Sequence, residues 1–235
     1  MHKFKYVDGC ALGIDKTHSG WKEAFRSAFK KLINDYNKVI FVFDGKVPPH
    51  KTKEHEHRRE SNDRLRKLAK ELLKNKETVL DAKKLLVKLI EVEELSCQLK
   101  ELITEMGAEF IQSEYEADEK LARMIINKDI DVILTEDTDL IVYGCENIIF
   151  KFNGNKGLLY NRNKFIDQSG FNEWELFQRF CILCGCDYYK YKGIAINTAK
   201  RICKSMKSYN EWENKIDDES KKKINNVLNI FNLII

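Results

Sequence analysis

The chain has 235 residues, enough for one globular domain with a sizeable core or for one domain with a substantial insertion. Hydrophobic residues make up 43% and charged residues 33% of it, which excludes collagen-like and largely disordered proteins. The 41 basic and 37 acidic residues leave a net charge of only +4, so the distribution of charge along the chain is more informative than its sum.

The start of the chain and the cysteines indicate a reducing compartment. The N-terminus has no apolar run of the signal-peptide kind, and nowhere do about 18 apolar residues follow one another, so we expect neither secretion nor a membrane span. Seven cysteines, an odd number, predict free thiols. Cys181, Cys184 and Cys186 have the spacing of half a zinc site, but buried thiols on an apolar helix are the favoured interpretation.

Strands and helices alternate in the first part of the chain. Residues 4–7 and 39–43 are apolar runs that predict strands, and the second run is continuous, as in a strand buried on both faces of a parallel sheet. Between them, residues 21–36 carry apolar side chains at helical spacing, which predicts an amphipathic crossover helix. The order is strand, helix, strand.

The two prolines of the chain, Pro48 and Pro49, follow the second strand and precede a charge-rich helical stretch from Lys51 to Met106. We interpret that stretch as an insertion. Beyond it, further strands are predicted at 108–112, 132–134, 147–152 and 157–160, and helices at 116–127, 172–184, 197–206 and 221–231. The pattern predicts an α/β fold whose mostly parallel sheet is flanked by helices.

Acidic residues gather where the predicted strands end. Because ligands of open parallel sheets bind beyond the carboxyl ends of the strands, we expect these side chains to share one rim. The candidates are Asp8, Asp44, Glu116, Asp118, Asp137, Asp139 and Asp187. Seven carboxylates in one cleft need counter-charge, and oxygen-only ligands favour Mg²⁺, with Mn²⁺ as a substitute. Two such ions about 4 Å apart suit phosphodiester hydrolysis.

Structural interpretations of single acids stay open beside this one. Ser113 and Glu116 fit a capping box, in which Glu116 would serve a helix terminus rather than a cation. Asp44 before Gly45 fits an ordinary turn, and Asp187 fits a loop residue at a helix end. The joint pattern of strand-ending aspartates and two acid-x-acid pairs favours the metal interpretation.

Two basic segments predict contacts with a phosphate backbone. Residues 46–76 hold 11 Lys/Arg against 5 Asp/Glu, an excess of 6. Lys51 and Arg58 lie two helical turns apart and are candidate electrophilic stabilisers, with Lys53 and Arg59 as candidate DNA contacts. A solvated helix face is the alternative for the later lysines and for the interleaved histidines.

The second basic segment, residues 190–207, has six Lys/Arg and no acid. Its sequence predicts a helix, a tight glycine turn and another helix, a hairpin that can offer backbone N–H groups to a phosphate without reading bases. An ordinary surface hairpin is the alternative. The candidate DNA-binding residues here are Lys192, Gly193, Lys200 and Arg201.

Four motifs in order resemble those of the XPG-like, structure-specific 5′ nucleases. They are FDGKVPPHK at 43–51, YEAD at 115–118, TEDTDL at 135–140 and GCDY at 185–188. The resemblance extends from about residue 6 to residue 206. Within the superfamily, Gly144-Cys145 and the CILCGCDY run at 181–188 resemble exonuclease 1 more than flap endonuclease.

The resemblance implies a PIN-like α/β nuclease core with a helical arch and a helix-two-turn-helix. It divides the chain into an N-terminal nuclease part (1–50), the arch (51–106), an internal nuclease part (107–189) and the helix-two-turn-helix with a C-terminal helix (190–235). It also implies hydrolysis of DNA at 5′ ends, nicks or flaps with two Mg²⁺ ions held by the seven carboxylates, by in-line attack of a metal-activated water. Lys51 and Arg58 match the family's catalytic basic pair, and Lys192 to Lys200 match the hairpin that grips duplex DNA and also binds K⁺. The family acts in DNA replication, mismatch repair and recombination, which implies a nuclear location.

Some positions depart from the family pattern. Its members begin earlier, with a Met-Gly segment whose terminus enters the active site, and we expect that element to be missing here because Met1 lies almost at the first strand. Ile14 stands where a stacking ring is usual, and Ala195 stands where the hairpin usually has a second glycine. The alternatives to a 5′ exonuclease are therefore a flap endonuclease with little exonuclease activity and a DNA-binding relative without catalysis.

Overall fold

The structure is a computed structural model of the chain. It describes residues 20–74, 78–82, 92–153, 156–186, 188, 195–208, 210–211 and 217–233, and the backbone of residues 3–7. Within these ranges, the backbone alone is described at positions 50, 53, 54, 58 and 92–95.

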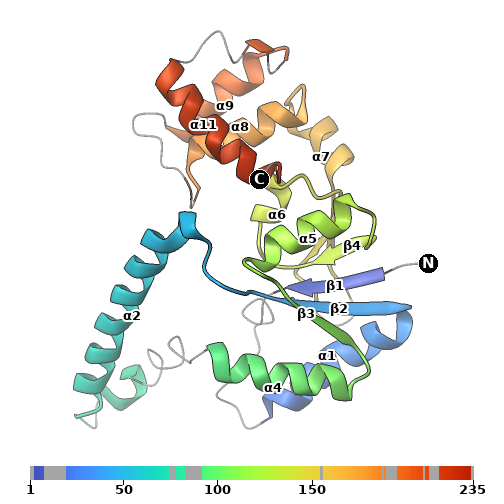
Figure 1. Ribbon diagram of the computed structural model, residues 1–235, viewed down its shortest axis with the longest axis vertical. Coiled ribbons are helices and arrows are strands. Elements are labelled where there is room, and N and C mark those ends of the chain that lie inside the picture. Colours follow the sequence, from blue (N-terminus) through green and yellow to red (C-terminus); the bar gives the residue numbers. More distant parts are fainter. Residues whose placement is uncertain are drawn as a thin grey trace.

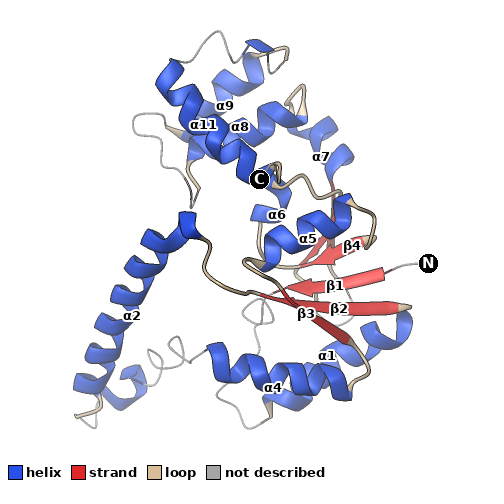
Figure 2. Ribbon diagram, in the orientation of Figure 1, coloured by secondary structure: helices blue, strands red, loops and turns tan. Residues whose placement is uncertain are grey.

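Six strands form a single sheet whose order is β3-β2-β1-β4-β5-β6 (Figure 2). Their bounds are β1 Lys3–Val7, β2 Lys38–Phe43, β3 Glu109–Gln112, β4 Val132–Leu134, β5 Asn147–Phe150 and β6 Leu158–Asn161. All neighbouring pairs are parallel except β5 and β6, which are antiparallel. The prediction of a mostly parallel sheet is therefore confirmed.

Strand β2 shows why the sheet needs helices on both sides. Its residues from Val39 to Val42 are all buried, at 5% exposure or less. Val39 and Phe41 belong to one hydrophobic cluster, whereas Ile40 and Val42 belong to another on the opposite face. The continuous apolar run is thus the consequence of alternate side chains entering two cores.

Helices α1 (Trp21–Asp35) and α4 (Val92–Glu105) cover one face of the sheet (Figure 1). Phe25 and Phe29 of α1 pack on Phe41, with ring centroids 5.7 and 5.5 Å away, and Leu102 of α4 is buried in the same cluster. The end of the predicted arch segment therefore contributes to the core. The domain boundary at residue 106 stays a prediction.

The other face is covered by α5 (Ala117–Ile126), and a group of helices extends the molecule beyond it (Figure 1). Leu121 and Ile125 of α5 pack in one cluster with side chains of the later helices. These helices are α6 Asp139–Val142, α7 Arg162–Ser169, α8 Trp174–Cys184, α9 Ile196–Ser205 and α11 Asp218–Phe231. Helices α6 and α7 were not predicted, whereas α1, α5, α8, α9 and α11 agree with prediction to within a few residues.

Helix α2 (Thr52–Leu72) extends away from the sheet (Figure 1) and follows the short 3-10 turn η1 (Pro49–Lys51). Most of its described side chains are exposed, and its charges form pairs such as Arg64–Glu60 and Arg66–Asp63 within the helix. A helix that is polar on nearly every side is suited to solvent or to a charged partner. Within the described residues, none of the helices combines the length and the apolar character that crossing a bilayer requires.

Gly45 forms the turn directly after β2, where it packs against the segment that follows β3. Its N–H donates to the carbonyl of Tyr115 at 2.5 Å, and the N–H of Lys46 donates to the carbonyl of Glu114 at 2.9 Å. A Cβ at Gly45 would collide with the backbone carbonyls of Ser113 and Glu114. Only glycine allows the two segments to approach so closely.

We therefore expect Gly45→Ala to lower the free energy of unfolding by about 1–3 kcal/mol, because backbone atoms must shift to admit the methyl group. Urea unfolding followed by circular dichroism measures this change. Gly20→Ala is the matched control, since a Cβ there meets nothing within 4 Å. Equal stability of the two variants would contradict the close packing of this turn.

Candidate active site

The carboxyl ends of four parallel strands lie at one edge of the sheet, as the register requires. Phe43 at the end of β2 pairs with Gln112 at the end of β3, and Tyr6 of β1 pairs with Leu134 at the end of β4. The described acids that follow these strands therefore lie at the same edge. Asp8, which follows β1, lies outside the described residues, as does Asp187.

Asp44 and the start of α5 are joined by a hydrogen bond. The backbone N–H of Ala117 donates to Asp44 Oδ1 at 2.7 Å. Ala117 stands between Glu116, the N-cap of α5, and Asp118 in its first turn. This contact brings Asp44 next to the first acid-x-acid pair. The capping-box interpretation of Glu116 is wrong, because among the described residues the buried Ser113 Oγ has no hydrogen-bond partner and Glu116 accepts no capping bond.

The second acid-x-acid pair lies in the turn between β4 and α6. The N–H of Asp137 donates to Thr135 Oγ1 at 2.9 Å, and the N–H of Asp139 donates to Asp137 Oδ1 at 2.8 Å. Thr135 is buried, which fixes the start of the turn. Asp137 thus has a local structural role at the start of α6, which does not remove its carboxylate from the sheet edge.

Asp118 lies in the field of the other carboxylates. Burial, as the largest cause, and the negative charges of Asp137, Asp44, Asp139 and Glu116 together raise its pKa to about 8. Its buried Oδ1 has no hydrogen-bond partner among the described residues. A half-buried carboxylate among four like charges is costly to ionise unless a cation is present.

The described carboxylates do not by themselves form a complete ligand set. Within the described part of the chain, no three Asp, Glu, His or Cys side chains lie close enough together to hold a metal ion. The chemistry of the group still fits a hard divalent cation, because all of its donor atoms are carboxylate oxygens, and a buried oxygen of Asp118 accepts no hydrogen bond from any described residue.

Lys51 supplies a positive charge beside this group. Its Nζ lies 2.6 Å from Glu116 Oε1, and its side chain is only 10% exposed. It also lies 4.8 Å from the centre of the Tyr188 ring, whose O–H donates to Glu116 Oε2 at 3.0 Å. The structure therefore brings Lys51 to the predicted carboxylates, and it adds Tyr188, for which the sequence predicted no role.

Burial raises the pKa of Tyr188 above its usual range, so the phenol stays protonated and acts as a donor. The sequence signal for this residue was its place directly after Asp187 in the GCDY motif. That signal marks a position beside the site, but only the fold shows which atoms the phenol and the ring contact.

The remaining predicted basic residues lie on two helices. Arg59 is exposed on α2, which also carries Lys53 and Arg58, whose side chains lie outside the described atoms. Lys200 and Arg201 are exposed on α9. Lys192 and Gly193 lie outside the described residues, so the predicted hairpin turn and its K⁺ site stay predictions.

The cysteines of α8 do not form a metal site in the described structure. Cys181 is half-buried, and burial raises the pKa of its thiol to about 12. Cys186 is half-buried as well. Cys184 is exposed, so the expectation of a buried thiol is wrong at this position.

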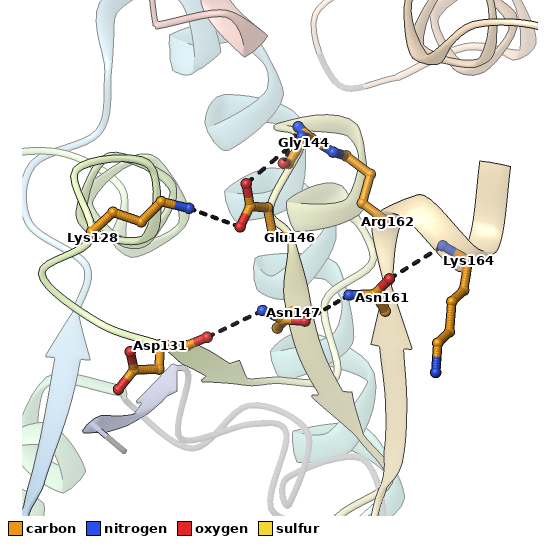
Figure 3. Close-up of polar contacts among 8 residues, drawn as sticks. All are labelled: Lys128, Asp131, Gly144, Glu146, Asn147, Asn161, Arg162 and Lys164. Atoms are coloured by element: carbon orange, nitrogen blue, oxygen red, sulfur yellow. Dashed lines mark hydrogen bonds and ion pairs between the residues drawn. The ribbon is translucent and has the colours of Figure 1, made fainter. Parts of the chain in front are cut away.

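The opposite edge of the sheet shows a different electrostatic pattern (Figure 3). Glu146, just before β5, accepts a hydrogen bond from Lys128 at 2.8 Å and lies 3.8 Å from Arg162. Hydrogen bonding to Lys128 lowers the pKa of Glu146. Asn147 and Asn161 continue this network with a 2.9 Å hydrogen bond. Glu146 is thus neutralised by its neighbours, in contrast to Asp118 at the carboxyl ends of the strands.

The raised pKa of Asp118 predicts a pH-dependent stability. The folded protein holds this proton more tightly than the unfolded chain, whose carboxyl titrates near 3.8, so stability falls as pH rises from about 4 to about 8. We expect Asp118→Asn to stabilise the metal-free protein at pH 8 by about 1–2 kcal/mol after solvent screening, or about 4 °C in melting temperature. Scanning calorimetry in EDTA measures it. At pH 4 the difference between the variant and the wild type should vanish. Equal melting temperatures of the two proteins at pH 8 would contradict the unfavourable environment of the Asp118 carboxylate.

Comparison with known proteins identifies relatives of this chain. Residues 107–187 match the XPG I-region, the segment that contains both acid-x-acid pairs. The chain is 31% identical to exonuclease 1 of Arabidopsis thaliana over 87% of its length, and 30% identical to flap endonuclease 1 of Entamoeba histolytica over 81%. It spans 31% of the first relative and 52% of the second. Relatives of both kinds match at similar identity, so the closer resemblance to exonuclease 1 stays a prediction.

Solved structures share the fold. The catalytic core of Rad2 in complex with DNA substrate matches with a TM-score of 0.62 and 17% identity, over 97% of this chain and 71% of that one. GEN1, a Holliday junction-resolving enzyme solved with product DNA and Mg²⁺, matches with a TM-score of 0.59 and 18% identity, over 91% of this chain and 47% of that one. These likenesses confirm the predicted α/β nuclease core. Motifs, sequence relatives and fold together place this chain in the XPG-like nuclease superfamily.

Proposed function

We propose that this chain is a divalent-metal-dependent nuclease that cleaves DNA at 5′ ends or flaps. The observation that carries the proposal is Asp118, a carboxylate in the field of four other acids, with a buried oxygen that has no hydrogen-bond partner among the described residues. Such a group is costly to keep without a cation, and its position at the carboxyl ends of parallel strands is where ligands of such sheets bind.

The residues that would hold the metal are the predicted acids at this edge. The described ones are Asp44, Glu116, Asp118, Asp137 and Asp139, and Asp8 and Asp187 complete the proposed set. Bound Mg²⁺, or Mn²⁺ in its place, would supply an activated water and stabilise charge on the phosphate oxygens. That GEN1 was solved with Mg²⁺ and product DNA supports the choice of ion.

Lys51 is proposed to hold the scissile phosphate. Its ammonium group is nearly buried and lies 2.6 Å from Glu116, so it already stands beside a proposed metal ligand. A desolvated cation in that position can stabilise negative charge that develops on a phosphate. Arg58, on α2, is proposed as its partner by the family resemblance.

The exposed basic residues are proposed to bind the DNA backbone. Arg59 on α2 and Lys200 and Arg201 on α9 are all exposed. Contacts of this kind position a duplex without reading its sequence, which suits recognition of a DNA structure. Relatives named exonuclease 1 and flap endonuclease 1 support a nuclease that acts at ends or flaps. The family resemblance adds 5′ polarity, roles in DNA repair and replication, and a nuclear location to the proposal.

The direct test is cleavage of end-labelled DNA. We expect the wild-type chain to release product from a 5′-flap or recessed duplex in Mg²⁺ and to release none in EDTA, because the carboxylate group needs the cation. Asp137→Ala should lower the single-turnover rate at least about 100-fold, since it removes a proposed ligand. Asp167→Ala, an exposed acid on α7, is the matched control and should cleave like the wild type.

The same assay separates the alternatives. Comparable digestion of the recessed duplex and the flap supports a 5′ exonuclease, whereas cleavage confined to the flap supports a flap endonuclease. Tight flap binding without product in any divalent metal, with Asp137→Ala identical to the wild type, would show a DNA-binding protein without catalysis and would refute the proposal.

A further inference from the structure

Tyr188 contacts two of the proposed functional groups at once. Its O–H donates to Glu116 Oε2 at 3.0 Å, and its ring face lies 4.8 Å from the Lys51 ammonium. We infer that Tyr188 is a positioning residue that holds the metal-ligating carboxylate and the phosphate-binding lysine in a fixed relation. This inference rests on the proposed function and adds a residue for which no role was predicted.

The hydroxyl contact orients Glu116. A carboxylate can turn about its terminal bond, and Lys51 alone holds only Oε1. The Tyr188 O–H holds Oε2, so the two contacts together define the plane of the carboxylate. Hydrogen bonds of this kind to a ligating carboxylate generally raise metal affinity because they reduce the orientations that the ligand must give up.

The ring contact holds Lys51 independently of Glu116. An ammonium group near the face of an aromatic ring is attracted to it, more strongly when both are shielded from water. The whole residue Lys51 is 8% exposed, so this attraction acts with little water nearby. A cation bound by Glu116 would compete with the Lys51 ion pair, but it would leave the ring contact unchanged. Lys51 can therefore keep its place when Glu116 Oε1 binds a metal instead of the ammonium group.

The Tyr188 ring is itself anchored in the core. It packs edge-on against Phe231 of α11, with ring centroids 5.4 Å apart, and its hydroxyl lies 3.5 Å from that of Tyr143. Phe231 is 1% exposed and Tyr143 is 5% exposed, and their rings also pack on each other at 5.0 Å. The C-terminal helix thus supports the site through Tyr188.

If Tyr188 served only to pack against its neighbours, its hydroxyl group would not be needed. Phenylalanine would fill the same space against Phe231, so packing alone does not require the hydroxyl. Tyr160 offers the contrast, because its buried hydroxyl has no hydrogen-bond partner among the described residues. Tyr188→Phe therefore removes a hydroxyl that forms a hydrogen bond. Tyr160→Phe removes one that forms none with the described residues.

The test measures Mn²⁺ binding by the free protein, through the electron paramagnetic resonance signal of unbound Mn²⁺. We expect Tyr188→Phe to weaken binding about 10-fold, whereas Tyr160→Phe leaves it unchanged. The melting temperature in EDTA should stay within about 2 °C of the wild type for both. The single-turnover cleavage rate of Tyr188→Phe should fall at limiting Mn²⁺ and recover at saturating Mn²⁺.

A second measurement isolates the ring contact. Acetylation of Lys51 by acetic anhydride, followed by mass spectrometry, should proceed at the wild-type rate in Tyr188→Phe and about 3–10-fold faster in Tyr188→Leu, which removes the ring. Rates at exposed Lys200 serve as the internal reference.

The outcomes separate this inference from the proposed function. If the wild type binds Mn²⁺ and cleaves DNA but Tyr188→Phe matches it in both assays, Tyr188 does not position the site and only this inference is refuted. If Lys51 is acetylated no faster in Tyr188→Leu than in the wild type, the Tyr188 ring does not hold the lysine. A wild-type chain that binds no Mn²⁺ refutes the proposed function and the inference together.

Discussion

Mutual repulsion among carboxylates at the ends of parallel strands is the constraint around which this site is built. The sheet brings Asp44, Asp137 and Asp139 to one edge, and α5 adds Glu116 and Asp118. Nothing in the strands requires these acids, since a parallel sheet is held by its backbone and by the two apolar cores on its faces. The repulsion among these carboxylates therefore lowers the stability of the fold, and a loss of stability of this kind is typical of a functional site.

The two edges of the sheet show how the same residue type acquires opposite properties. Glu146 at the amino-terminal edge has Lys128 and Arg162 as neighbours, and hydrogen bonding lowers its pKa. Asp118 at the carboxyl edge has burial and like charges, which raise its pKa. Lys51 is the described lysine that forms an ion pair with the acidic group, and it contacts Glu116 rather than Asp118. The net charge of the described part of the site is therefore negative, which suits a divalent cation better than a further side chain.

Much of the sheet and its helices could be predicted because the apolar pattern is strong. The apolar run of β2 is unbroken because the strand is buried on both faces. The apolar residues of α1 have helical spacing because the helix is buried on one face. Helix α7 was missed because none of its residues is fully buried, so it has no apolar stripe to detect. Its signals were local, a capping bond from Lys164 N–H to Asn161 and a left-handed Gly170 at its end. The capping-box pattern at Ser113 gave a wrong prediction for the opposite reason. The local motif was present, but the turn buries Ser113 away from the start of the helix.

The sequence by itself determined which acids follow strands, where the basic segments lie and which family the motifs resemble, because these properties depend on neighbours along the chain. Only the tertiary structure decided which atoms meet. The contact between Asp44 and the N–H of Ala117 joins residues 73 positions apart, and the contact between Tyr188 and Glu116 joins residues 72 apart. Distances of that kind depend on strand register and helix packing, which no short motif encodes. The same reason explains why the sequence marked Tyr188 as part of a motif, while its contact with Lys51 had to come from the fold.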